Sequence, residues 1–168
     1  ALSNVSAGLT LGTSSASGTI QNDDRSIASI SASTTNVIEG DAGTTPFTFK
    51  ITLDQASVTS QSIDWSVIGS GSHPANSADF GGAFPSGAVT FAPGEIAKSV
   101  TIDISGDTVL EFSEQFSVAL AHPSSGLTLG TASIAGTIVN DDGLVASIAD
   151  LSATRLEGND GTTEFSFT

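Results

Sequence analysis

The sequence predicts an all-β fold, a seven-stranded antiparallel Greek-key β-sandwich of the immunoglobulin-like kind. Three observations support this prediction. Apolar and polar residues alternate with a period of two in several short runs, such as Phe47 to Leu53 and Phe116 to Leu120. Turn-forming clusters such as Phe84 to Gly87 separate the runs. No segment of useful length has the helical period, and about seven short strands with regular turns are typical of a sandwich.

The strands can be assigned in chain order, and their alternate side chains should meet between the two sheets. The expected strands A to G cover residues 27–31 with 37–38, 47–53, 61–68, 88–91, 100–104, 116–120 and 133–139. Trp65 lies on the same side of its strand as Ile63 and Val67, the side expected to face the core. This favours a core role for Trp65 over a role as an exposed platform on which a sugar ring stacks. The expected core comprises Phe47, Phe49, Ile51, Trp65, Val67, Phe91, Val100, Ile102, Phe116, Val118 and Ile138.

Composition excludes several classes of partner and chemistry. Eighteen Asp and Glu against four Lys and Arg give the 168-residue chain a formal charge of −14, which should repel nucleic acid and anionic membranes. No apolar run approaches the roughly 18 residues of a membrane span, so direct membrane insertion is not expected. The chain has no cysteine, so disulfides and thiolate metal sites are excluded and a hard, oxygen-ligated cation remains. The acidic, cysteine-free composition favours an extracellular protein, secreted or at a cell surface.

An internal repeat runs through the chain at one constant offset. Gly8 to Thr13 recurs as Gly126 to Thr131, 118 residues later, and Asn22-Asp23-Asp24 recurs as Asn140-Asp141-Asp142 at the same offset. Roughly half of the 50 overlapping positions are identical, far more than shared composition would give. The offset equates Leu9, Leu11 and Ile20 with Leu127, Leu129 and Ile138, and Phe165 and Phe167 with Phe47 and Phe49.

The repeat predicts three parts of the chain. Residues 25–143 form one complete domain, residues 1–24 are the last strands of a preceding repeat, and residues 144–168 are the first strands of a following one. The sequence thus has the pattern expected of an excerpt from a tandem array. The expected partners are neighbouring copies of the same repeat, either in the same chain or supplied by another chain.

Six motifs follow one another over more than a hundred residues: Val37 to Asp41, Ala78 to Phe80, Val89 to Glu95, Gly106 to Glu111, Glu114 to Phe116 and Gly136 to Asp142. In their order and spacing they resemble the Calx-β domain. The resemblance implies the seven-stranded sandwich of that family, which occurs in sodium–calcium exchangers, in cell-surface proteins and in large bacterial surface or secreted repeat proteins. The repeat length and composition here resemble the bacterial kind.

A cluster of carboxylates is expected at one pole of the sandwich, where the turn after strand A, the E–F loop and the end of strand G can meet. Carboxylates without a neighbouring cation repel one another unless they are solvated or bind an ion. The resemblance implies calcium as the cofactor and places five residues on family ligand positions: Glu39, Asp107, Glu111, Asp141 and Asp142. Glu114 is a secondary candidate. Gly71 and Ser113 stand where the family often has acidic residues, and a solvated acidic pole without metal remains the alternative.

No enzymatic function is expected. His73 and His122 lie beside prolines in loops and outside any HExxH pattern, and Asp41 and Asp79 are most simply interpreted as turn-capping residues. The favoured function is a calcium-binding structural repeat of an extracellular adhesin or stalk, with calcium stiffening the pole between domains. The alternative is a subunit of a self-assembling extracellular filament, joined by strand complementation between chains. A distal receptor is not identified by the sequence.

Overall fold

The computed structural model describes a β-sandwich with short flanking segments. The described residues are 3–4, 6–10, 12–13, 15–20, 24–144, 146 and 158–162. Nine strands and one short 3₁₀ helix, η1, follow one another within the sandwich. They are β1 (Ser26–Ala32), β2 (Asn36–Ile38), β3 (Thr44–Leu53), β4 (Gln61–Ser70), η1 (Ala78–Phe80), β5 (Ser86–Phe91), β6 (Ala97–Ser105), β7 (Glu114–Ala121), β8 (Leu127–Leu129) and β9 (Ser133–Val139). No helix in the described part of the chain is long and apolar enough to cross a membrane.

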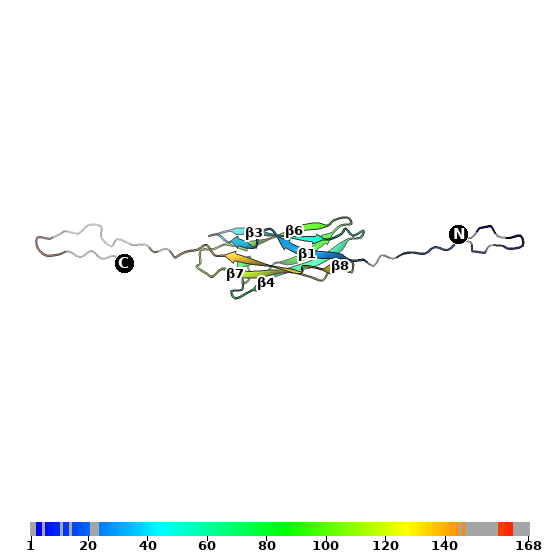
Figure 1. Cartoon of the computed structure of the whole chain (residues 1–168). Helices are drawn as coiled ribbons and strands as arrows, with labels where there is room; N and C mark the ends of the chain where they lie inside the picture. The colour runs from blue at the N-terminus through cyan, green and yellow to red at the C-terminus, as the bar shows by residue number, and fades with distance from the viewer. Residues whose placement is uncertain are drawn as a thin grey trace.

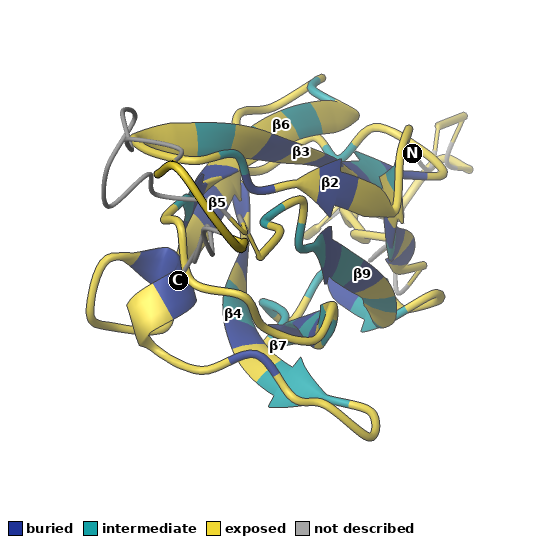
Figure 2. Cartoon of the chain, turned by 90° about the vertical axis from the view of Figure 1, so that its left-hand side faces the viewer, coloured by how far each residue is buried: buried dark blue, intermediate teal, exposed yellow. Residues whose placement is uncertain are grey.

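The strands form two layers that pack face to face (Figure 2). One sheet has the order β6-β3-β1-β8 and the other has the order β2-β9-β7-β4-β5. The predicted sandwich is therefore confirmed, with predicted strand A divided into β1 and β2, which belong to different sheets. Most neighbours are antiparallel, but β1 pairs with β8 in parallel and β2 pairs with β9 in parallel. The sheets are mixed for this reason, because the first and last strands run in the same direction.

The core lies between the sheets and follows the predicted period of two. In β3 the burial alternates from Phe47 to Leu53, and Phe116 and Val118 of β7 are fully buried opposite them. Nine of the eleven expected core residues are buried: Phe47, Phe49, Ile51, Val67, Phe91, Ile102, Phe116, Val118 and Ile138. Large buried side chains of this kind contribute about 1.5–3 kcal/mol each to the free energy of folding.

Trp65 and Val100 are only partly buried, although both pack against the core as expected. The Trp65 ring meets Phe49 edge to face, with 5.3 Å between the ring centroids. On its other side Gly87 of β5 leaves room for the indole, because a Cβ at that position would lie 3.1 Å from the ring. The core interpretation of Trp65 is thus supported by its contacts, while its burial is smaller than the alternating pattern alone indicates.

The chain reaches the sandwich at one end and leaves it at the other (Figure 1). β1 begins at the N-terminal pole, and β9 ends at the C-terminal pole. Among the described residues of the N-terminal flank no strand is formed, and Leu9 and Ile20 are 64% and 99% exposed. Their predicted role as strands of a preceding repeat stays a prediction. The corresponding expectations for Leu11, Phe165 and Phe167 lie outside the described residues.

Candidate metal centre

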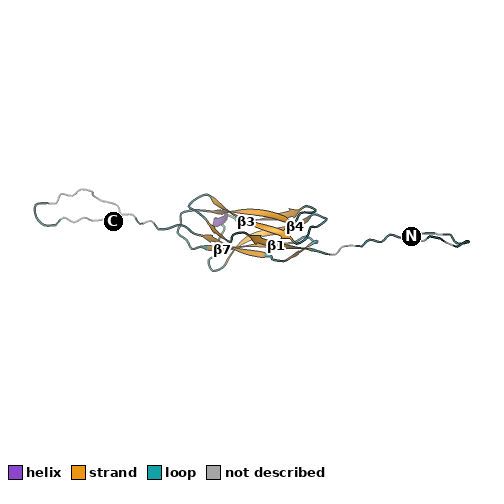
Figure 3. Ribbon diagram, turned by 45° about the horizontal axis from the view of Figure 1, so that its top comes forward, coloured by secondary structure: helices purple, strands orange, loops and turns teal. Residues whose placement is uncertain are grey.

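Four connections meet at the C-terminal pole: residues 39–43, 71–85, 106–113 and 140–144. Strand directions place them there, since β2, β4, β6 and β9 all end at this pole. Figure 2 views the sandwich from this side, and Figure 3 shows η1 at the same end. These connections and the first residue of β7 carry eight carboxyl groups, which we call the acidic pole: Glu39, Asp41, Asp79, Asp107, Glu111, Glu114, Asp141 and Asp142.

Backbone contacts fix the relative positions of these connections. Gly106 packs so closely on the β2–β3 turn that a Cβ there would overlap the carbonyl oxygen of Gly40. The Gly40 N–H in turn donates a hydrogen bond to Asp141 Oδ1 at 3.0 Å. Asn140 Nδ2 donates to the carbonyl oxygen of Glu111 at 2.7 Å, which ties the end of β9 to the loop between β6 and β7. The connections that carry the acidic side chains are therefore held next to one another by the fold.

One group of carboxylates forms between the β2–β3 turn and the end of β9. Oxygen atoms of Asp41, Asp141 and Asp142 lie within 4.8 Å of one another. Asp142 Oδ2 is shielded from solvent and has no hydrogen-bond partner in the described structure. Burial, followed by the charges of Asp41, Asp141 and Asp107, raises the pKa of Asp142. A buried carboxylate oxygen without a partner is costly, so this position favours an added cation.

A second group forms between η1 and the start of β7. Oxygen atoms of Asp79, Glu111 and Glu114 lie within 4.8 Å of one another, and Asp79 is only 8% exposed. Burial, then a hydrogen bond and the charge from Asp79, raise the pKa of Glu114 to about 8. Burial and the neighbouring charges of Asp107 and Asp79 also raise the pKa of Glu111. In the absence of a cation, this group holds a proton near neutral pH.

Glu39 interacts electrostatically with both groups. It is 5% exposed, and its pKa is raised to about 7 by burial, then by the charges of Asp107, Glu111 and Asp142. Asp107 occupies the loop that faces it, and Asp107 Oδ1 accepts a hydrogen bond from the Val109 N–H at 2.7 Å. Glu39 and Asp107 belong to neither compact group, but they interact electrostatically with carboxyl groups of both.

No cationic side chain offsets this charge in the part of the chain that the structure describes. The ion pairs there involve Lys98 with Glu95 and His122 with Asp64, all outside the acidic pole. A donor set made only of carboxylate and carbonyl oxygens suits hard divalent cations and not zinc or copper. The two groups together offer oxygen ligands for more than one such ion.

The structure brings all five sequence-predicted ligands to the acidic pole but divides them. Asp141 and Asp142 join one group, Glu111 joins the other, and Glu39 and Asp107 lie in neither. The sequence interpretation missed Asp41 and Asp79, which were expected only to cap turns. Asp79 does hold its own loop, since its Oδ2 accepts a hydrogen bond from the Asn76 N–H at 2.6 Å. Its position in the Ala78-Asp79-Phe80 motif was the signal that could have identified it.

Gly71, where the resemblance suggests an acidic residue, has a structural reason to be glycine. Its φ of +73° lies in the left-handed region, and a Cβ there would overlap the Gln115 side chain. Asp79 and Glu114 supply carboxylates to the neighbouring part of the pole instead. Position 71 thus carries no carboxyl group, but two other residues provide carboxyl groups at the same end of the sandwich.

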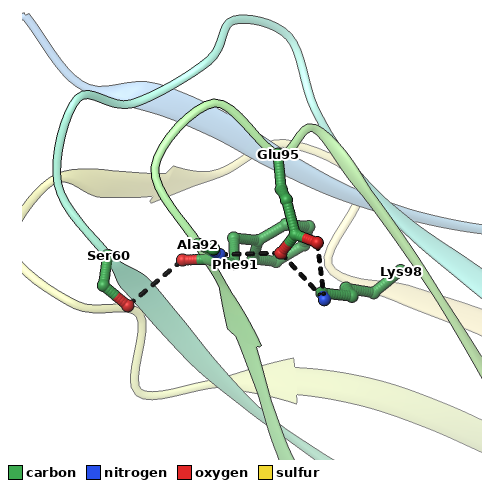
Figure 4. A network of polar contacts seen from close by, with 5 residues as sticks. All are labelled: Ser60, Phe91, Ala92, Glu95 and Lys98. Atoms are coloured by element: carbon green, nitrogen blue, oxygen red, sulfur yellow. Dashed lines mark hydrogen bonds and ion pairs between the residues drawn. The ribbon is translucent and has the colours of Figure 1, made fainter.

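At the N-terminal pole, acidic side chains form hydrogen bonds and ion pairs with other groups of the chain. Glu95 Oε2 accepts a hydrogen bond from the Ala92 N–H at 2.7 Å, and the same carboxylate pairs with Lys98 Nζ at 2.8 Å (Figure 4). The hydrogen bond from Lys98, followed by that from Ala92, lowers the pKa of Glu95. Acidic residues at this end therefore have partners within the chain, in contrast to those of the acidic pole.

Comparison with known proteins gives the same fold. The crystal structure of the apo form of the Calx CBD1 domain superposes with a TM-score of 0.58 and 21% identity, covering 71% of this chain and all of that one. The structure of CBD12 from CALX1.2 gives 0.56 and 22%, covering 69% of this chain and 46% of that one. The calcium binding domain CBD12 of CALX1.1 gives 0.52 and 23%, covering 64% and 41%. No curated protein sequence matches the chain.

A family model covers most of the chain, including every strand of the sandwich. The model for the Calx-beta domain matches residues 21–143. That range contains β1 to β9 and all eight carboxylates of the acidic pole. The chain belongs to the Calx-beta domain family.

Proposed function

We propose that this chain is a non-catalytic, calcium-binding structural repeat of an extracellular adhesin or stalk protein, with calcium bound at the acidic pole. The observation that carries the proposal is the convergence of eight carboxyl groups without a cationic partner among the described residues. Asp142 Oδ2, shielded and unpaired, and Glu39, with a pKa of about 7, are the clearest members. The expected ligands are Glu39, Asp107, Glu111, Asp141 and Asp142, to which the geometry adds Asp41, Asp79 and Glu114.

Calcium fits this arrangement better than magnesium does. Calcium accepts six to eight oxygens in a flexible shell, whereas magnesium requires a tight octahedron and keeps several waters. The acidic pole is built from loops and turns of different strands, so its ligand distances are not set by one rigid element. A structural neighbour carries the name calcium binding domain, which is consistent with this choice of ion.

Calcium at this position would stiffen the connection between repeats. Asp141 and Asp142 directly follow β9, and the residues from Leu144 onward correspond to the start of another repeat in the 118-residue register. An ion that joins these residues to Asp41 would fix the direction in which the chain leaves the sandwich. The acidic, cysteine-free composition supports an extracellular location, where calcium is plentiful.

Calorimetry with and without calcium tests the proposal. A ligand that binds only the folded state stabilises it by about 2.7 kcal/mol at a hundredfold excess over its dissociation constant, so Tm should rise measurably in calcium and fall in chelator. Magnesium at the same concentration is the control and should give a smaller rise. Equal melting curves in calcium and in chelator would show that the pole is a solvated acidic surface.

A filament of strand-complemented chains is the second candidate, favoured by the exposed apolar residues of the N-terminal flank. Leu9 and Ile20 are 64% and 99% exposed, and such side chains gain free energy when they are covered. In a filament, the N-terminal strands of one chain would pair with the C-terminal strands of the next. Removing residues 1–24 should then abolish assembly seen by analytical ultracentrifugation, whereas a chain that is monomeric at high concentration would exclude the filament.

A further inference from the structure

The loop between β6 and β7 carries apolar side chains on its outer surface, beside the acidic pole. We call Val109, Leu110 and Phe112 the apolar tip; they are 55%, 53% and 72% exposed. The Phe112 ring stacks on His73 with 4.5 Å between the ring centroids. The carbonyl oxygen of His73 accepts a hydrogen bond from the Gln115 N–H at 2.8 Å, which anchors this support to β7. The Phe112 ring is therefore supported by His73, while the apolar tip remains exposed to solvent.

The apolar tip lies next to the link that leads out of the domain. Asn140, directly after β9, holds the loop through its hydrogen bond to the Glu111 carbonyl at 2.7 Å. In the 118-residue register, Leu144 takes the position of Ser26, the first residue of β1. Only five Cα steps join Val139 to Leu144, and they span at most about 17 Å. In the tandem arrangement of the proposed function, the N-terminal pole of the following repeat would therefore lie against the loops of this pole.

The N-terminal pole offers a cavity in the position that such a neighbour would reach. The cavity has a volume of about 280 Å³ and is lined by residues 55–59 with Asp24, Ser26, Gln61 and Gly126; most of these residues are polar, and Ala56 and Val58 are its apolar side chains. Val58 is 90% exposed. Asp24 also lines this cavity, and in the repeat register Asp24 takes the position of Asp142. The cavity thus borders the link that arrives from a preceding repeat.

A hydrogen-bond network keeps the wall of this cavity in shape. Gln61 Nε2 donates to Ser57 Oγ at 3.1 Å and to Thr59 Oγ1 at 2.9 Å. Ser124 Oγ donates to Gln61 Oε1 at 2.5 Å, and the Gly94 N–H donates to the Ser57 carbonyl at 2.9 Å. A preformed wall loses little conformational freedom when it receives a partner.

We propose that the apolar tip of one repeat docks into the cavity at the N-terminal pole of the next copy in the same chain. Consecutive repeats are then joined by contacts of the apolar tip with Ala56 and Val58 at the cavity, as well as by the covalent link. The proposal shares the tandem arrangement with the proposed function, but it does not depend on calcium binding. Its occupant is a second copy because a link of four residues leaves the two poles no room to separate.

A tandem chain tests the contact directly. In the described part of the chain, all core residues lie between Ala28 and Ile138, so one repeat has a core of its own. Residues 24–143 followed immediately by residues 26–143 reproduce the natural register. With only the second copy isotope-labelled, its amide NMR signals from residues 55–59 should differ from those of a single repeat. Phe112→Ser in the first copy should return these signals to their single-repeat positions.

The matched control is Phe112→Ser in the second copy, whose pole faces no further repeat; it should leave the signals of residues 55–59 unchanged. Val58→Ser in the second copy should weaken the docking contact between the two copies, and the same change in the first copy should not. Identical signals in tandem and single chains, or differences that survive Phe112→Ser in the first copy, would overturn the docking contact.

Repeating the measurement in calcium and in metal-free buffer separates the two proposals. In one outcome, Phe112→Ser in the first copy removes the difference between tandem and single-repeat signals, but Tm does not depend on calcium. This outcome would support docking and refute the calcium site. A calcium-dependent Tm together with identical tandem and single-repeat signals would refute docking alone.

Discussion

The two poles of the sandwich are built from connections between the same strands, yet they satisfy their polar groups in different ways. At the N-terminal pole, Glu95 pairs with Lys98, Asp54 accepts the Ile27 N–H at 2.6 Å, and Gln61 is held by hydroxyl groups. At the acidic pole, Asp142 Oδ2 has no partner and Glu39 is buried among other carboxylates. The polar groups named at the N-terminal pole find partners within the chain, whereas the carboxyl groups of the acidic pole need an added cation or bound protons.

The largest expected effect comes from removing the aromatic side chain beneath the acidic pole. Phe116 is fully buried and meets Phe47 and Phe80 edge to face, at centroid distances of 5.1 and 5.6 Å. Phe116→Ala should lower the free energy of unfolding by about 3–5 kcal/mol, measured by urea denaturation. Because Phe80 adjoins Asp79, calcium affinity of the folded fraction should fall as well.

The matched control for Phe116→Ala is Phe91→Ala near the N-terminal pole. Phe91 is 1% exposed, so the loss of stability should be similar. Calcium affinity, measured by isothermal titration calorimetry under conditions where each variant is folded, should remain at the native value. Equal loss of affinity in both variants would show that the two poles are not energetically distinct.

A smaller effect is expected from filling the close approach at Gly106. Gly106→Ala places a Cβ against the Gly40 carbonyl, and overpacking of this kind costs about 1–3 kcal/mol. Gly94→Ala at the N-terminal pole has open space around the new Cβ and a φ of +87°, so its cost should be the conformational one of about 1–2 kcal/mol. Thermal unfolding of both variants measures the costs, and only Gly106→Ala should also weaken calcium binding.

Removing one charge should distinguish the poles without altering their packing. Asp107→Asn keeps an oxygen that can accept the Val109 N–H but removes a charge that faces Glu39. Calcium affinity should fall about tenfold, which corresponds to about 1.4 kcal/mol. Asp54→Asn, the control at the N-terminal pole, likewise keeps an acceptor for the Ile27 N–H and should leave affinity unchanged. Similar losses in both variants would indicate only a general effect of net charge.

The last expected effect is a pH dependence of stability in metal-free buffer. The pKa values of Glu39 and Glu114 are raised from 4.5 to about 7 and about 8, so the folded chain retains protons that the unfolded chain releases. Their stabilising contribution is present below about pH 4.5 and is lost as pH rises through 7 to 8. Tm from calorimetry should therefore decline across this range.

Calcium and Glu39→Gln are the controls for this pH dependence. Calcium competes with protons at the acidic pole, so it should remove the decline in Tm. Glu39→Gln should make the decline shallower, because one of the two groups that retain protons is gone. A Tm that rises with pH in metal-free buffer would contradict the assignment.

Much of the fold could be predicted because each strand carries its own period. Phe47 and Phe49 alternate with polar neighbours, so their burial follows from local pattern alone. The parallel pairings of β1 with β8 and β2 with β9 could not be predicted this way, since they depend on how the first strand divides between two sheets. Trp65 shows a similar limit, because its partial burial depends on the neighbouring edge strand.

The candidate site was predictable where strand order alone decides position. Asp141 and Asp142 follow the last strand, so the pole they occupy is fixed by topology. The residues around Asp79 favour a turn cap. The Ala78-Asp79-Phe80 motif marks Asp79 as a candidate, but no local signal indicates that η1 brings it beside Glu114. Carboxylates from long loops become neighbours only through tertiary packing.

The parallel pairing of the first and last strands determines how the domain carries mechanical tension. The chain enters at β1 and leaves after β9 at the opposite end, so pulling on the two ends draws these strands apart along their own axes (Figure 1). The hydrogen bonds of β1 with β8 and of β2 with β9 are then loaded together in shear and not opened one at a time. Resistance to force is governed by the unfolding rate, and in this geometry the strand axes lie along the line of pull, so the inter-strand hydrogen bonds run across it and must break together.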